Sequence, residues 1–140
     1  MTEGIVRFKV RYAETDQMGF VHHPHYLIWF EIGRTELMRQ LGYAYADIER
    51  EGTLLAVAEV SLRYARAARY DDDILLVTRV AAVQSRTITF SYRVLREHDA
   101  DLELLATGVT RLIAIDRTGA PKRLPAELLQ RFRETTASSS

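Results

Sequence analysis

The first part of the chain alternates between apolar and polar residues, which is the pattern of a β-strand with one buried face. The alternation covers Ile5–Tyr12. The apolar set that we expect to face the core is Val6, Phe8, Val10 and Tyr12. A polar turn, AETDQMGF, follows, and Gly19 within it can adopt the positive φ that a chain reversal needs.

A helical spacing of apolar residues begins after this turn. Pro24 suits the first turn of a helix, where its missing N–H costs nothing, and Gly42 is a typical C-terminal stop. The repeating positions are Tyr26, Leu27, Phe30, Leu37, Met38 and Leu41, with Ile28, Trp29 and Ile32 widening the apolar surface. We therefore expect this helix to be covered on most sides and to form the centre of the fold. A shorter helix is expected around Tyr45–Glu51.

The remainder of the chain predicts a sheet. Four segments rich in Val, Leu, Ile, Thr and Tyr are separated by polar turns: Leu54–Ala65, Ile74–Gln84, Thr87–Glu97 and Leu102–Asp116. Connections this short make neighbouring strands antiparallel, because parallel pairs need a long crossover. A short helix is expected over Pro125–Arg133, and no linker divides the chain. Residues 1–134 are thus predicted to form one domain, and residues 135–140 a disordered tail.

These elements predict an α+β fold in which an antiparallel sheet is wrapped around one long central helix. One sheet and one helix of this size leave an apolar surface or a strand edge exposed. We therefore expect at least a dimer.

Composition narrows the classes of partner. The formal net charge is zero, so no basic field indicates nucleic acid or a membrane surface. The chain has no cysteine, which excludes disulfides, thiolate metal sites and a cysteine nucleophile. The opening residues MTEGIVRFKV are too charged for a signal peptide, and no apolar run reaches the ~18 residues of a membrane span. We expect a cytoplasmic protein with no nucleic-acid or membrane partner.

Asp16, in the turn before the long helix, is the first candidate for chemistry. An aspartate in this place often only turns the backbone or caps the helix. It also suits a general base or nucleophile acting on a carbonyl held by backbone N–H groups at the helix start, where the helix dipole favours developing negative charge. Both interpretations remain open from spacing alone.

Three histidines lie at the start of the helix: His22, His23 and His25. Metal-binding histidines are usually one helical turn apart or accompanied by carboxylates, so we expect no metal here. One of the three is expected to orient substrate or water, and the others to be solvated.

Glu59 interrupts the apolar run LLAVAEVSL. It either lies on the outward face of a strand or faces the helix start as a second acid, where burial would raise its pKa. Four arginines lie at predicted strand ends and turns: Arg63, Arg66, Arg69 and Arg86. Surface charge is their default role, and binding the phosphates of a substrate is the alternative.

The segment RYAETDQMGFVHHPHYLIWFEIGRTELMRQLG resembles the signature of the hotdog-fold acyl-CoA thioesterases of the 4-hydroxybenzoyl-CoA thioesterase and YbgC-like group. The later segment RYARAARYDDDILL resembles the second signature of this family, and the similarity covers about residues 6 to 133. The resemblance implies a hotdog fold that dimerises edge to edge, often pairs again into a homotetramer, and carries its active sites at the dimer interface.

The resemblance also implies roles for individual residues. The catalytic aspartate of the family falls on Asp16, an active-site His or Tyr falls on His23, and a Tyr near the acid falls on Tyr12. Backbone N–H groups near Val21–His23 would polarise the thioester carbonyl. The expected substrate-binding residues are Gly19, Val21, His22, Pro24, His25, Glu59 and Arg86. In two departures from the family pattern, His25 replaces the usual Asn, and Ala67 replaces a Pro of the second signature.

The expected function is hydrolysis of an acyl-CoA thioester, with Asp16 as general base or nucleophile. No cofactor is expected, because coenzyme A is part of the substrate. Two alternatives remain: a thioesterase for acyl chains on a carrier protein, and an acyl-CoA-binding module without turnover.

Overall fold

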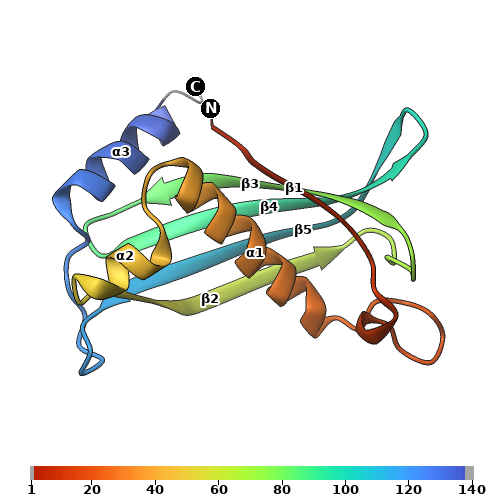
Figure 1. Ribbon diagram of the computed structural model, residues 1–140, viewed down its shortest axis with the longest axis horizontal. Coiled ribbons are helices and arrows are strands. Elements are labelled where there is room, and N and C mark those ends of the chain that lie inside the picture. The colour runs from red at the N-terminus through yellow and green to blue at the C-terminus, as the bar shows by residue number, and fades with distance from the viewer. Residues whose placement is uncertain (1, 138–140) are drawn as a thin grey trace.

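Five strands form one antiparallel sheet in the order β1-β3-β4-β5-β2 in the structure, a computed structural model that describes residues 2–137. Their bounds are β1 Gly4–Lys9, β2 Leu54–Tyr64, β3 Asp73–Val83, β4 Thr87–His98 and β5 Asp101–Ile115. The long helix α1, Pro24–Gln40, lies across one face of this sheet (Figure 1). The predicted α+β architecture is therefore confirmed. No helix within residues 2–137 is long and apolar enough to cross a membrane.

Two shorter helices, α2 (Tyr45–Arg50) and α3 (Ala126–Ala137), lie at the end of the sheet where α1 finishes (Figure 1). Helix α3 packs on β3 and continues past its predicted end at Arg133. Thr135 is buried there, and its hydroxyl donates to Arg131 O at 3.1 Å, which holds the last turn in place. Residues 135–137, predicted to be a disordered tail, are thus helical, and the rest of that tail, residues 138–140, lies outside the described residues.

Strand β1 ends three residues before its predicted end. Glu14 N donates to Arg11 O at 3.0 Å, and the Glu14 carboxylate accepts from Arg11 N at 2.8 Å. These two bonds close the chain into the 3₁₀ helix η1, Tyr12–Glu14, which stops the alternation. Val10 faces the core as predicted, whereas Tyr12, predicted on the same face of the strand, lies in η1 and is 78% exposed, so its assignment to the strand is wrong.

Two close approaches seat α1 on the sheet. A Cβ atom at Gly108 on β5 would lie 2.4 Å from the ring of Phe30, and one at Gly33 would lie 2.3 Å from Thr78 Oγ1 on β3. Only glycine therefore fits at either position with the helix at this height. Phe30 in turn stacks on Tyr92 of β4, with ring centroids 4.1 Å apart.

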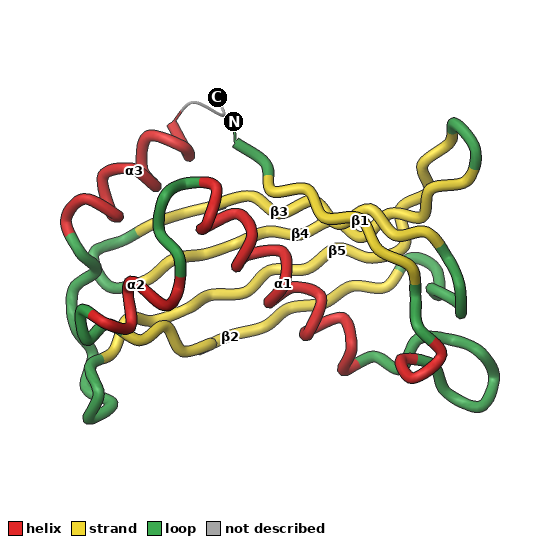
Figure 2. Tube along the Cα trace, in the orientation of Figure 1, coloured by secondary structure: helices red, strands yellow, loops and turns green. Residues whose placement is uncertain are grey.

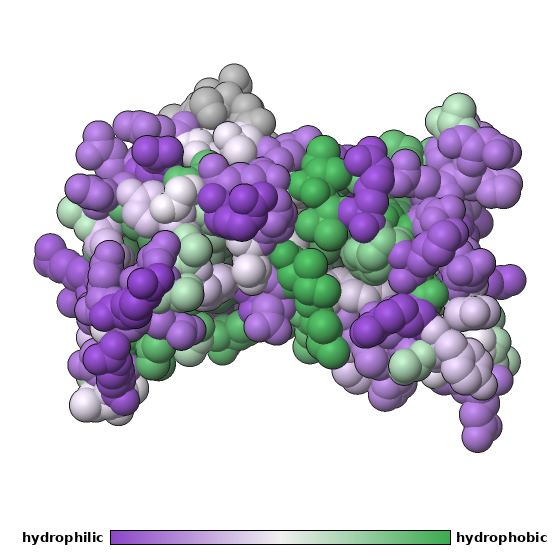
Figure 3. Space-filling model, viewed as in Figure 1, coloured by the Kyte–Doolittle hydropathy of each residue, from purple (hydrophilic) through white to green (hydrophobic). Residues whose placement is uncertain are grey.

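The opposite side of α1 is open. Leu27, Ile28 and Ile32 are each more than 40% exposed, so the prediction that the helix is covered on most sides is wrong for a single chain. The reason is that one sheet covers only one side of a helix. Figure 3 shows the apolar side chains as a band across this face of the molecule. Strand β2, at the edge of the sheet, exposes Val57 and Val60 as well.

Candidate active site

The loop between β1 and α1, residues 10–23, carries the candidate acid and is here called the acid loop. Hydrogen bonds attach it to the connection between β2 and β3. Both segments lie at the same end of the sheet (Figure 2). Val21 N donates to Ala68 O at 2.9 Å, and Tyr70 N donates to Gly19 O at 3.1 Å. The Arg69 guanidinium also lies over the Phe20 ring, 5.2 Å from its centroid. These contacts give the polar loop a fixed shape.

Asp16 uses one carboxylate oxygen to build this loop. Its Oδ1 accepts from Met18 N at 2.8 Å and from Phe20 N at 3.2 Å, and Gly19 closes the turn with a φ of +83°. The other oxygen, Oδ2, accepts no hydrogen bond from any residue between 2 and 137. The side chain is exposed. Asp16 therefore has the structural role considered from the sequence and also keeps one oxygen available for chemistry.

The start of α1 offers fewer free donors than predicted. Val21 N is used by Ala68 O, and His22 N donates to Glu14 O at 2.9 Å. Pro24 is the first helical residue and has no N–H. The prediction is therefore wrong for Val21 and His22, whose N–H groups build the loop. Of the three N–H groups of Val21–His23, only that of His23 has no acceptor within residues 2–137.

The three histidines lie together at this helix start. The ring of His22 is 5.0 Å from that of His23 and 6.3 Å from that of His25. His22 and His23 are exposed, whereas His25 is half-buried, and its Nδ1 is buried without a hydrogen-bond partner in the described chain. Over residues 2–137, no three His, Asp or Glu side chains are grouped so that they could hold a metal ion. Tyr12 lies on the neighbouring turn, edge-on to Tyr70 at 5.8 Å.

Glu14 is a buried residue of this site for which no role was predicted. It is 3% exposed; its Oε1 accepts from Arg11 N, and its Oε2 accepts from Trp29 Nε1 at 2.8 Å. Burial alone would raise the pKa of Glu14, but these two hydrogen bonds and the nearby Arg11 guanidinium more than offset it and lower the pKa. The carboxylate is therefore held in its charged form inside the fold.

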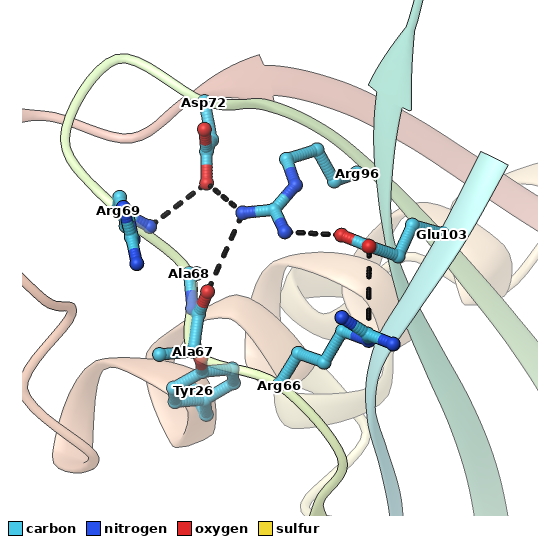
Figure 4. Close-up of polar contacts among 8 residues, drawn as sticks. All are labelled: Tyr26, Arg66, Ala67, Ala68, Arg69, Asp72, Arg96 and Glu103. Carbon is cyan, nitrogen blue, oxygen red and sulfur yellow. Dashed lines mark hydrogen bonds and ion pairs between the residues drawn. The ribbon is translucent and has the colours of Figure 1, made fainter. Parts of the chain in front are cut away.

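A charged cluster supports the loop from the sheet side (Figure 4). Arg96 on β4 donates to Asp72 Oδ2 at 2.8 Å and also binds Glu103 on β5. Asp72 accepts from Arg69 N at 2.8 Å, so the turn that contacts the acid loop is tied to β4. Partial burial would lower the pKa of Arg96, but the carboxylates of Asp72 and Glu103 raise it above its usual value. The cluster is thus a chain of contacts from the sheet to the acid loop.

Glu59 does not reach the site. A bulge between Val57 and Glu59 breaks the alternation of β2, so Val57 and Val60 face α1 and Glu59 points to the opposite face of the sheet. There Glu59 Oε1 is 2.8 Å from Arg111 Nη2, and this hydrogen bond lowers the pKa of Glu59 instead of raising it. The structure therefore contradicts the prediction that Glu59 is a second acid in the pocket.

The predicted arginines are not one cluster. Arg86 lies in the β3–β4 turn, at the opposite end of the sheet from Asp16 (Figure 2). Arg63 lies on the outer face of β2, near Arg93 and Thr107. Arg66 and Arg69 belong to the β2–β3 connection beside the acid loop, where Arg66 lies 3.7 Å from Glu103. Of the four predicted arginines, Arg66 and Arg69 are therefore the two that lie near the candidate site within one chain.

Within residues 2–137, the candidate site thus has a carboxylate oxygen without a partner and a free N–H at the start of α1, both at the same end of the fold. A sheet wrapped around that helix, with the acid in the preceding loop, is the arrangement of the hotdog-fold thioesterases. A family model described as the Thioesterase-like superfamily matches residues 10–132. The chain belongs to this superfamily.

Curated relatives include two acyl-CoA thioesterases. The chain is 37% identical over 86 residues, or 61% of its length, to the putative acyl-CoA thioesterase YneP of Bacillus subtilis, and the match spans 62% of YneP. It is 25% identical over 137 residues, 96% of its length, to the acyl-CoA thioester hydrolase YbgC of Escherichia coli O6:H1, which is covered completely.

Two solved structures share the fold and more than a quarter of the sequence. The hypothetical protein TT1821 from Thermus thermophilus has a TM-score of 0.86 and 35% identity, with 96% of this chain and 98% of that chain covered. The DHNA-CoA thioesterase from Staphylococcus aureus also has a TM-score of 0.86, with 31% identity and coverage of 99% and 91%. The predicted hotdog fold is confirmed.

Proposed function

We propose that this protein hydrolyses acyl-CoA thioesters, with Asp16 as the catalytic carboxylate and the N–H of His23 as the donor to the thioester oxygen. The observation that carries this proposal is the free Oδ2 of Asp16 at the same end of the fold as the free N–H of His23. Such a donor at a helix start is worth on the order of 3 kcal/mol to the transition state.

Two routes use the same atoms. As a general base, Asp16 takes a proton from water while the water oxygen bonds to the carbonyl carbon; the C–S bond then breaks, and the thiolate leaves and is protonated. As a nucleophile, Asp16 Oδ2 bonds to the carbonyl carbon and expels the thiolate, and water then hydrolyses the mixed anhydride. Single turnover in heavy-oxygen water tests the nucleophilic route, because label in the Asp16 carboxylate can arise only when water attacks the aspartyl carbon of the anhydride.

The relatives support coenzyme A as the carrier of the acyl group, since YneP, YbgC and the S. aureus enzyme are each named as hydrolases of CoA thioesters. An acyl-acyl carrier protein thioesterase of Arabidopsis thaliana, ATL3, is 25% identical over 91% of this chain and 66% of its own length. Because of this similarity, acyl carrier proteins are tested as substrates alongside the acyl-CoAs.

The test is thiol release from a panel of aliphatic and aromatic acyl-CoAs and from matched acyl carrier proteins. The proposal expects turnover of at least one acyl-CoA, and Glu59→Gln is expected to match the wild type because Glu59 faces away from the site. Turnover of carrier-protein thioesters alone would select the first alternative. Saturable CoA binding with no thiol release would select a binding module.

The open face of α1 and the edge of β2 support a homodimer. Leu27 and Ile28 of α1 and Val57 and Val60 of β2 line a hollow of about 260 Å³. An exposed edge strand beside an apolar hollow is a common place for a second copy to pair. Sedimentation at several concentrations distinguishes a monomer from the dimer and from the homotetramer that the family resemblance implies.

A further inference from the structure

We propose that Glu14 is a positioning residue that sets the place of Asp16 relative to the start of α1. This inference rests on the proposed function. The new element is a second acidic residue of the site, which touches no substrate and acts through Asp16.

The side chain of Glu14 joins the acid loop to the core of the protein. One oxygen holds Arg11 N at the beginning of the loop, and the other holds the indole N–H of Trp29, which lies in α1. Trp29 is 1% exposed and packs against Phe8 at 5.0 Å and Tyr26 at 4.9 Å. Because the indole is fixed on several sides, it is a rigid anchor for the carboxylate.

The main chain of Glu14 joins the same loop to the helix start. Its carbonyl oxygen accepts from His22 N at 2.9 Å. Asp16 is two residues after Glu14, and His23, with the free N–H, directly follows His22. Glu14 therefore connects the segment that carries the catalytic carboxylate to the helix start that carries the oxyanion donor, through one buried residue. Misplacement of reacting groups by about 1 Å can cost on the order of 100-fold in rate.

Glu14→Gln tests this role with almost no change in volume. The two donors reach different oxygens of Glu14, so the single carbonyl oxygen of glutamine can lie at Arg11 N or at Trp29 Nε1 but not at both. Trp29→Phe removes the second bond from the other side and leaves Glu14 unchanged. Glu36→Gln is the matched control, since Glu36 is a partly exposed glutamate of α1 whose carboxylate pairs with Arg39.

The kinetic readout is kcat and KM for an acyl-CoA that the wild type hydrolyses. We expect Glu14→Gln and Trp29→Phe each to lower kcat roughly 10- to 100-fold with KM little changed. The double variant should lose no more than the worse single one, because each change interrupts the same connection from Arg11 N through the Glu14 side chain to Trp29. The emission of Trp29, the only tryptophan of the chain, should change in Glu14→Gln and not in Glu36→Gln.

The decisive experiment measures the rate of thiol release by Asp16→Asn with and without Glu14→Gln, with enzyme in excess over substrate. If Glu14 acts through Asp16, its substitution has no further effect on the remaining rate. An equal fold loss in both backgrounds, or unchanged kcat in folded Glu14→Gln and Trp29→Phe, would overturn the positioning role and leave the proposed function standing. A wild type that releases no thiol would overturn the proposed function and this role with it.

Discussion

Replacing Gly108 with alanine tests how α1 is seated on the sheet. The added Cβ would lie 2.4 Å from Cε2 and Cζ of Phe30, about 1 Å inside the ordinary contact distance of 3.4 Å or more. Phe30 is fully buried and stacked on Tyr92, so its ring has no free space to enter. Overpacking of this kind typically costs about 1–3 kcal/mol. We therefore expect the free energy of unfolding to fall by about that amount.

Urea denaturation of both proteins at one protein concentration measures this loss. Val109→Ala is the control, because Val109 is the next residue of β5 but is exposed on the opposite face of the sheet. Gly108→Ala combined with Phe30→Leu should recover part of the stability, since the shorter side chain makes room for the new methyl group. A Gly108→Ala protein as stable as the wild type would refute the close seating of α1.

Three further outcomes are expected. Arg96→Met should lower stability by about 1 kcal/mol and slow thiol release, whereas Arg7→Met, which breaks the exposed Arg7–Glu97 pair, should do neither. Because folding lowers the pKa of Glu14, its contribution to stability is present above the unfolded pKa of about 4.3 and is lost as the pH falls through the folded pKa. Urea titrations at several pH values should therefore show that the free energy of unfolding falls less steeply with acidification in Glu14→Gln than in the wild type. Val60→Lys should shift the sedimentation coefficient toward the monomer.

The periodicity of the sequence was enough to predict the architecture. The helical spacing after Pro24 and the stop at Gly42 match α1, whose following glycine has a φ of +90°. Segments rich in Val, Leu, Ile, Thr and Tyr between short polar turns likewise predicted four of the strands to within about one residue. These patterns are local, and burial on one face enforces them.

The details of the site depend on contacts between distant residues, which periodicity does not contain. The bulge before Glu59 reverses which face it occupies, and nothing in LLAVAEVSL marks the extra residue. Glu14 and Trp29 are fifteen positions apart, and only the folded loop brings them together. The sequence shows that Glu14 lies between a predicted strand and a predicted helix and that the chain has a single tryptophan. These two facts do not specify a hydrogen bond between Glu14 and Trp29.

The rate of thiol release by Asp16→Asn tests most directly whether Asp16 is the catalytic carboxylate. Asparagine keeps a side-chain oxygen that can accept from Met18 N and Phe20 N, so the loop should fold and bind CoA as in the wild type. We expect kcat to fall at least ~100-fold while CoA binding is retained. A folded, CoA-binding Asp16→Asn protein with wild-type kcat would contradict the assignment of Asp16 as the catalytic carboxylate.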